Sequence, residues 1–286
     1  MNVTIPETIK LKKKQKIIYI SIIAFCIIAI IMAFYVQFYA RLDYLEMLGI
    51  KQSEYGKLDE ERAETLKSNF DSLFNNNVQN VSEKNNEKRK DKEKSIVYTS
   101  LEKKDVKQNN YDIDVHIPYI NVENESVDKI NKEIESVFTA KANSLLNSEN
   151  KNAIYMVTYT ANIEYDILSV MIKANLKEGT SAQRLIIQTY NYDLRNNKEI
   201  DLEEVLRIRN IEISTMQNKI NKEVEKEEKK VEDLKSLGYN IYNRDTSSDI
   251  YKVENTKTFY VTNEAVYVIY AYGNDAFTSE KDLIVV

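Results

Sequence analysis

Several residue types on which enzymes and extracellular domains depend are nearly absent from this chain of 286 residues. It has one cysteine, Cys26, one histidine, His116, and no tryptophan. One cysteine excludes a disulfide framework within the chain, and one cysteine with one histidine cannot form a Cys/His zinc site. Five glycines and two prolines give little support to Gly-rich phosphate loops or collagen-like repeats. We therefore expect regular helices and strands, no cofactor and no metal site.

One long uncharged run lies near the start of the chain. Residues 17–39 carry no charge over 23 positions. At about 1.5 Å per residue, such a helix spans roughly 34 Å, which is enough to cross a hydrocarbon core of about 30 Å. A buried core helix rarely stays apolar on every face, and the apolar core of a cleaved signal peptide is usually only about 7 to 15 residues long. The run predicts a transmembrane helix anchored in the lipid bilayer.

The charges before this helix predict its orientation. Residues 1–16 contain five lysines and one acidic residue, Glu7. Basic segments beside a membrane helix tend to remain in the cytoplasm. We therefore expect a single-pass protein of the plasma membrane, with a short cytoplasmic N-terminus and an extracellular C-terminal part.

A charged stalk is predicted over residues 40–94. Residues 41–110 hold 14 basic and 14 acidic side chains. Residues 75–94 have too little apolar content to offset their ordering entropy, so a flexible linker is expected there. A helical stripe precedes it, which favours either a packed juxtamembrane helix or a homodimer through the stalk. The stripe consists of Leu58, Leu66, Phe70, Leu73 and Phe74.

The remaining residues, 95–286, read as one folded domain. Residues 111–119 alternate between apolar and polar, as in a half-buried strand, and an amphipathic helix follows with Asn124 or Ser126 as its cap. Further strands are expected at 154–165, 168–176, 182–194, 258–262, 265–272 and 283–286. A helical region opens at Asp201, and a long polar helix ends before Gly238. Because most strands follow one another through tight turns, we expect an α+β fold with an antiparallel sheet and packed helices.

Three groups of residues in this order resemble a known bacterial domain. They are 112–118 with 130–134, 190–194 with 199–206, and 258–262, reading DIDVHIP, INKEI, YNYDL, EIDLEEVL and TFYVT. Residues 95–286 are similar to the PdaC/RsiV-like extracytoplasmic domain, which occurs in peptidoglycan deacetylases and in lysozyme-responsive anti-sigma factors. The resemblance implies an α+β domain outside the cell. It does not imply deacetylation, which in those relatives needs a metal held by an aspartate and two histidines.

The charge of the domain indicates what it could bind. Residues 111–286 carry 21 basic and 30 acidic side chains. Such a surface repels nucleic acid and attracts cationic proteins. Lysozyme is one candidate partner, and a cell-wall component is another.

Tyrosine is abundant, with 20 residues, and several lie on the predicted C-terminal hairpin. Most would be core residues, because aromatic rings suit a pleated sheet. Some could instead form a recognition face, since tyrosine gives a large contact area for little lost rotamer freedom. The candidate ligand-binding face consists of Tyr267, Tyr270, Tyr272, Asp275 and Phe277.

Other candidate groups have simple structural interpretations. His116 lies on a polar strand face with Asp112 and Asp114, where solvation explains the pattern as well as a pH-sensitive cluster does. The carboxylate pairs Glu164 and Asp166, and Glu203 and Glu204, would be the starting point for a glycosidase. With 45 acidic residues in the chain, such pairs arise by chance.

These observations favour a membrane-anchored, non-catalytic ligand-binding or sensor protein of the bacterial cell envelope. Two alternatives remain open. One is an anti-sigma factor that responds to lysozyme, and the other is an enzyme that modifies cell-wall glycan.

Overall fold

The computed structural model describes residues 58–75, 88–147, 152–272 and 280–286, which belong to a unit that spans Tyr55–Val286. Residues 1–16 and the transmembrane helix predicted over 17–39 lie outside the described residues. Among the helices of the described part, none is long and apolar enough to cross a membrane.

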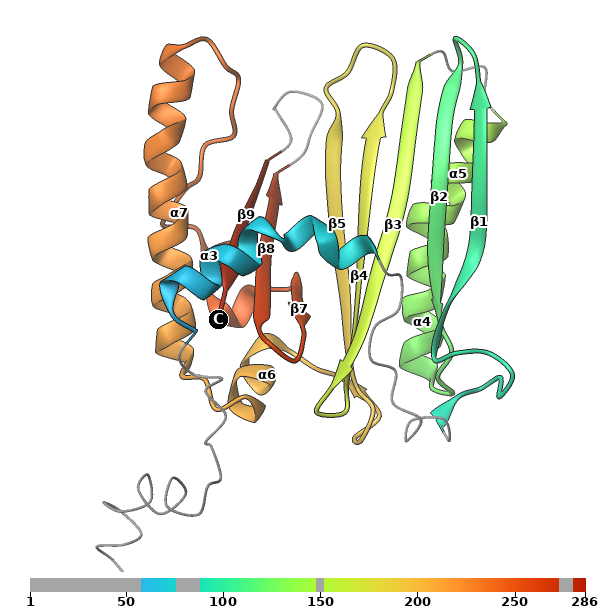
Figure 1. Cartoon of the computed structure of the whole chain (residues 1–286), viewed down its shortest axis with the longest axis horizontal. Coiled ribbons are helices and arrows are strands. Elements are labelled where there is room, and N and C mark those ends of the chain that lie inside the picture. Colours follow the sequence, from blue (N-terminus) through green and yellow to red (C-terminus); the bar gives the residue numbers. More distant parts are fainter. Residues whose placement is uncertain (1–57, 76–87, 148–151, 273–279) are drawn as a thin grey trace, which may run out of the picture. The chain divides into compact units, whose positions relative to one another are not determined.

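Six strands form the larger sheet (Figure 1). In order they are β1 (Val97–Lys107), β2 (Tyr111–Ile120), β3 (Ala153–Glu164), β4 (Ile167–Lys177), β5 (Arg184–Asp193) and β6 (Lys198–Glu199). All neighbours are antiparallel except β2 and β3, which are parallel. A parallel pair needs a crossover, and the intervening helices provide it.

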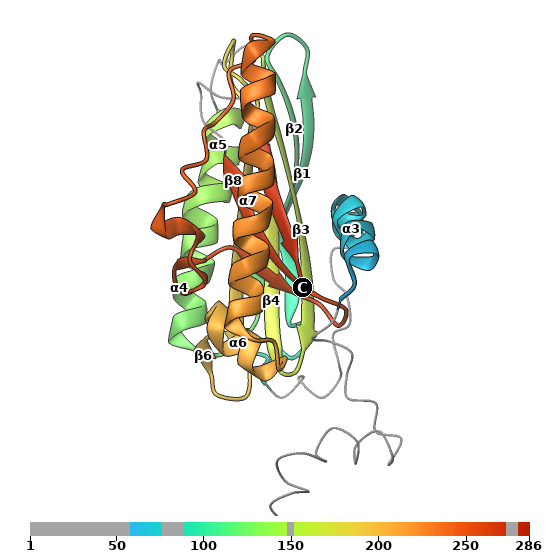
Figure 2. The same ribbon diagram turned by 90° about the vertical axis from the view of Figure 1, so that its left-hand side faces the viewer.

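The crossover helices cover one face of this sheet. They are α4 (Glu125–Ile134), a π-helical turn η4 (Glu135–Thr139) and α5 (Ala140–Leu146). The Asn124 side chain caps α4 by accepting a hydrogen bond from the Ser126 amide at 2.8 Å. Alternate residues of the strands are buried against the helices, among them Val115, Tyr155 and Ile172. Figure 2 shows α4 and α5 on one side of the sheets and α3 on the other.

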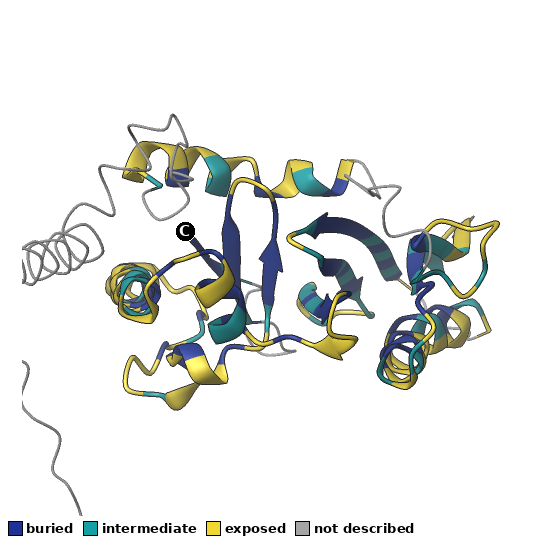
Figure 3. Ribbon diagram, turned by 90° about the horizontal axis from the view of Figure 1, so that it is seen from below, coloured by how far each residue is buried: buried dark blue, intermediate teal, exposed yellow. Residues whose placement is uncertain are grey.

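A second sheet contains β7 (Phe259–Val261), β8 (Val266–Tyr272) and β9 (Glu280–Val285). Helices α6 (Leu202–Ile208) and α7 (Ile213–Ser236) pack on one of its faces, where Val205, Met216 and Ile220 meet Val268 and Ile284. Figure 3 shows the buried strands between helices whose outer surfaces are exposed. Two short 3₁₀ turns, η5 (Asp249–Tyr251) and η6 (Val253–Asn255), follow α7.

The opposite face of the second sheet is covered by α3 (Glu60–Ser68) and η2 (Phe70–Asn75). Phe70 and Phe74 are buried there, 1% and 7% exposed, and Phe70 contacts the Tyr267 ring at 6.1 Å between centroids. The predicted helical stripe is therefore part of the fold. The compact unit begins well before the domain boundary predicted near Ser95, because these apolar side chains have a sheet to pack on.

Residues 88–94, at the end of the predicted linker, also contact the larger sheet. The Asn121 side-chain amide donates hydrogen bonds to the carbonyls of Asp91 and Ser95, at 2.8 and 3.1 Å. The rest of that linker, residues 76–87, lies outside the described residues.

The α+β class and the packed helices are confirmed. The expected antiparallel sheet differs in three respects, since the strands divide into two sheets, one pair is parallel, and β1 was not predicted. Strand β1 forms one edge of the larger sheet and has Glu102, Lys103, Lys104 and Asp105 in succession. Charged residues are common on edge strands, and they hide the alternation by which a strand is recognised.

Candidate functional site

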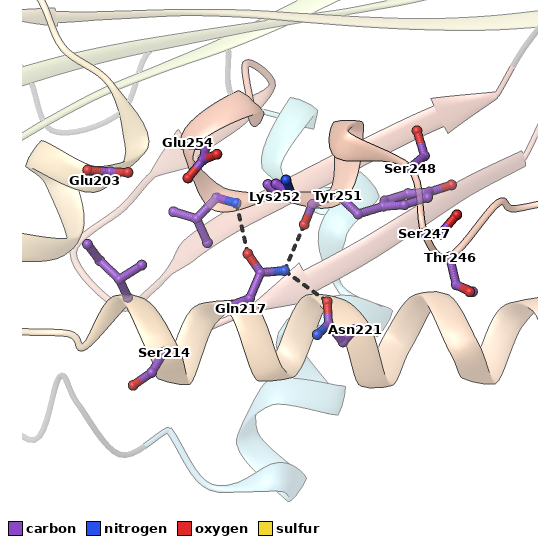
Figure 4. Close-up of a pocket in the computed structure, with 12 residues that line it drawn as sticks. Glu203, Ser214, Gln217, Asn221, Thr246, Ser247, Ser248, Tyr251, Lys252 and Glu254 are labelled. Carbon is purple, nitrogen blue, oxygen red and sulfur yellow. Dashed lines mark hydrogen bonds between the residues drawn. The ribbon is translucent and has the colours of Figure 1, made fainter.

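A cleft with both polar and apolar lining lies between α7, the beginning of α6 and residues 246–254 (Figure 4). Its volume of about 580 Å³ falls within the usual range of small-ligand sites, roughly 300–1,000 Å³. Hydroxyl and amide groups make up much of its lining, from Ser214, Gln217, Asn221, Thr246, Ser247 and Ser248.

Gln217 holds one wall of the cleft in place. Its Oε1 accepts a hydrogen bond from the Val253 amide at 3.0 Å, and its Nε2 donates to the Tyr251 carbonyl at 2.9 Å and to Asn221 Oδ1 at 2.8 Å. Figure 4 shows these three bonds radiating from one side chain. Since Gln217 lies on α7, its amide ties the loop after α7 back to that helix.

Tyr251 joins the cleft to the second sheet. Its side chain is buried, and its hydroxyl lies 2.9 Å from that of Tyr272 on β8. Tyr272 in turn donates to Asp282 Oδ2 at 2.8 Å. Burial, together with the negative charge of Asp282, raises the pKa of Tyr272 far above its ordinary value.

A buried ion pair completes this network. The Arg244 guanidinium makes two hydrogen bonds of 2.7 Å to the two carboxylate oxygens of Asp282, and these residues are 5% and 1% exposed. Burial by itself lowers the pKa of Arg244, but the hydrogen bonds and charge of Asp282 outweigh it and raise that pKa. This ion pair holds the loop before η5 against β9, and that loop leads into the residues 246–254 that line the cleft.

The five residues of the predicted recognition face do not form one exposed surface in the described part. Tyr267 and Tyr272 are buried, at 2% and 8% exposure, and Tyr270 is half-buried with its hydroxyl 2.9 Å from Thr256 Oγ1. Tyr267 faces α3 and η2, whereas Tyr270 and Tyr272 belong to the cluster beneath α6 and α7. Asp275 and Phe277 lie outside the described residues. Ligand contact by this group stays a prediction.

His116 lies on the outer face of β2, half-buried. Its Nε2 is 3.3 Å from Asp114 Oδ1, and the other Asp114 oxygen accepts a hydrogen bond from Lys104 at 2.8 Å. That bond lowers the pKa of Asp114. In the described ranges, no three His, Cys, Asp or Glu side chains come together as a group that could hold a metal ion.

The carboxylate pairs weighed for a glycosidase face different partners. Asp166, in the turn after β3, accepts two hydrogen bonds from Arg195, at 3.1 and 2.5 Å. Glu204 pairs with Lys198 on β6, whereas its neighbour Glu203 lines the cleft. On α7, ion pairs form at a spacing of three residues, Glu223 with Lys226 and Glu227 with Lys230.

Of the residues that line the cleft, sequence reasoning named only Glu203, as one member of a carboxylate pair. Gln217 is one polar residue on a polar helix, and nothing in its spacing marks it. Arg244 and Asp282 are 38 positions apart, so their pairing depends on the tertiary fold. A buried arginine beside a strand aspartate leaves no signal in the sequence of one chain.

Comparisons with known proteins identify only distant structural likenesses. No protein-family model matches the chain, and no curated protein matches it. A DUF3298 family protein from Pseudomonas aeruginosa is similar in structure, with 13% identity, a TM-score of 0.36, and coverage of 66% of this chain and 87% of that one. A DUF3298 family member from Bacteroides fragilis has 15% identity and a TM-score of 0.29, with coverage of 56% and 61%. At these scores the likeness carries no conclusion about what the chain does.

Proposed function

We propose that the chain is a single-pass membrane protein that holds a non-catalytic ligand-binding domain outside the bacterial cell. The observation that carries the proposal is the uncharged run over residues 17–39, which precedes a folded α+β unit. The five lysines before that run favour a cytoplasmic N-terminus.

The ligand proposed for this domain is a cationic protein or a cell-wall component. The excess of nine acidic over basic side chains in residues 111–286 supports the first, because opposite charge raises the rate of encounter. Titration calorimetry of the full chain in nanodiscs with lysozyme, at low and at moderate salt, measures this directly. Saturable heat that weakens with salt supports a cationic partner, and the absence of heat at both concentrations contradicts lysozyme as that partner.

The topology is tested by adding protease to intact cells that produce the chain with a C-terminal tag. We expect the tag to be digested in intact cells, whereas an N-terminal tag survives until the cells are lysed. Replacing Ile27 and Ile28 by aspartate should abolish anchoring and provides the matched control. A C-terminal tag that is protected in intact cells but digested after lysis would contradict the proposal.

The anti-sigma alternative predicts a different partner for residues 1–16. Capture from cells through a tag at the N-terminus would then recover a sigma factor. Recovery of a sigma factor would make signalling the function, and capture without one would favour a binding protein that acts outside the cell.

A further inference from the structure

The charges around the cleft beside α7 do not balance. Glu203 and Glu254 line it, and neither forms an ion pair with any residue that the structure describes. The guanidinium closest in sequence to Glu203, that of Arg207, bonds the Glu203 carbonyl oxygen at 3.4 Å. Lys252 also lines the cleft, and its ammonium lies 2.8 Å from Asp249 Oδ1 and interacts at longer range with Glu254. Glu203, Glu254 and Asp249 therefore place three carboxylates around this one ammonium group.

The two carboxylates come from neighbouring elements. Glu203 is in the first turn of α6, Glu254 is in η6, and these elements contact one another. Figure 4 shows both carboxylates on the same side of the cleft, across from α7. A third negative group, Asp245, lies just outside the lining, and hydrogen bonds from Ser247 hold its pKa below the ordinary value. The field in the cleft is therefore negative.

The lining also contains an apolar surface. Ile213, at the start of α7, is 40% exposed although it is a large hydrophobic residue. The one aromatic residue of the lining, Tyr251, is only 3% exposed. The lining thus offers contact to an aliphatic chain and offers no exposed ring on which a sugar could stack.

We propose that this cleft binds a positively charged organic group on an aliphatic stem, such as an alkylammonium group. Glu203 and Glu254 receive the charged end, Ile213 contacts the stem, and the hydroxyls of Ser214 and Ser247 accept further hydrogen bonds. An anionic ligand is disfavoured because the lining has no uncompensated cation. The Gln217 bonds keep the wall in place before binding, which lowers the entropy lost on association.

The same chemistry occurs in a free diamine and in a lysine side chain of a partner protein. Only binding of a partner protein's lysine rests on the proposed function. Binding to the cleft is measured on purified protein, so a negative result there would leave the proposed membrane topology untouched. The probes are cadaverine and the blocked tripeptide acetyl-Ala-Lys-Ala-amide, each titrated into the full chain in zwitterionic nanodiscs. The norleucine tripeptide, which lacks the ammonium group, is the matched control ligand.

We expect saturable binding of at least one cationic probe and at least tenfold weaker binding of the norleucine peptide. The double variant Glu203→Gln with Glu254→Gln should bind the cationic probe about tenfold more weakly or worse. Glu225→Gln, at an exposed position of α7, should leave the affinity for the probe unchanged. Tighter binding of the peptide than of cadaverine assigns the cleft to a protein partner, and the reverse assigns it to a free amine. Binding that is equal for the norleucine peptide, unchanged in the double variant, or absent for both cationic probes overturns the proposal. Thermal melts of both variants, compared with the parent, establish that they remain folded.

Discussion

The side chain of Asn191, on β5 of the larger sheet, bonds the backbone of Phe259 at the edge strand β7 of the smaller sheet. Asn191 Nδ2 donates a hydrogen bond to the Phe259 carbonyl at 2.9 Å, and Asn191 Oδ1 accepts from Ser169 Oγ at 2.6 Å. The same Ser169 oxygen lies 3.3 Å from the Val261 amide. The Asn162 side chain donates a further hydrogen bond to the Val261 carbonyl at 3.1 Å. Side chains of the larger sheet thus supply hydrogen-bond partners for backbone groups at the edge of the smaller sheet.

Replacing Asn191 by alanine should therefore weaken the joint between the sheets. The substitution leaves the buried Phe259 carbonyl and the Ser169 hydroxyl without their partner, which typically costs about 1–3 kcal/mol. We expect a loss of that size in the free energy of unfolding, measured by urea titration. Asn218→Ala, at an exposed position of α7, should change it by less than about 0.5 kcal/mol. Equal effects from the two substitutions would show that the joint does not depend on this bond.

The Arg244 and Asp282 pair gives a second prediction. Removing Arg244 leaves the buried Asp282 carboxylate without its cation, which typically costs about 3–5 kcal/mol, whereas removing Asp282 leaves Arg244 with a second partner, Glu280, at 3.0 Å. Arg244→Met alone should therefore destabilise the fold strongly, and Arg244→Met with Asp282→Leu should destabilise it less than the sum of the two single changes. Urea unfolding of the parent, the two single variants and the double variant gives the coupling free energy between Arg244 and Asp282.

The exposed pair Lys252 and Asp249 is the control for that cycle. Its side chains are 52% and 75% exposed, so solvent screens the interaction and the coupling should stay below about 1 kcal/mol. If the buried pair couples no more strongly than this one, the network behind the cleft is not held by its ion pair.

Local patterns predicted the elements of the fold better than their assembly. The strand over 111–119 and the cap at Asn124 agree with β2 and α4, because alternation and capping are properties of neighbouring residues. Gly238 follows the long helix as expected, and its φ of +89° suits a residue without a Cβ. The packing of the two sheets against each other involves side chains such as Asn191, which bond residues far apart in the sequence, and no local pattern predicts such bonds.

The candidate site could not be predicted for a related reason. The Tyr-rich hairpin suggested a recognition face, but Tyr267 and Tyr272 lie on β8 between two helical layers that bury them. Glu203, which is half-buried, and Gln217 line one cleft only because the fold places residues 246–254 beside α7.

Gln217 allows a test of whether the cleft wall is held by one side chain. Gln217→Ala removes three hydrogen bonds, so the loop around Val253 should open more often while α7 keeps its apolar contacts. Hydrogen exchange at the Val253 amide should become about tenfold faster or more, with little change at the amides of β4. Ser214→Ala, in the same cleft, should leave this exchange rate unchanged. A uniform rise across the sheet would instead indicate a global loss of stability.

The buried tyrosines predict how the fold responds to alkaline pH. Burial is the main cause that raises the pKa of Tyr267 and of Tyr270 to about 12, against an unfolded value of about 10. Because the folded state favours the protonated hydroxyls, their contribution to stability is complete below pH 10 and is lost as the pH rises toward 12. Absorbance at 295 nm should show exposed tyrosines ionising near pH 10 and a later, cooperative phase that coincides with unfolding by circular dichroism. Phenylalanine cannot ionise, so Tyr270→Phe should move the pH midpoint of alkaline unfolding upward. An unchanged midpoint would show that ionisation of Tyr270 does not drive this unfolding.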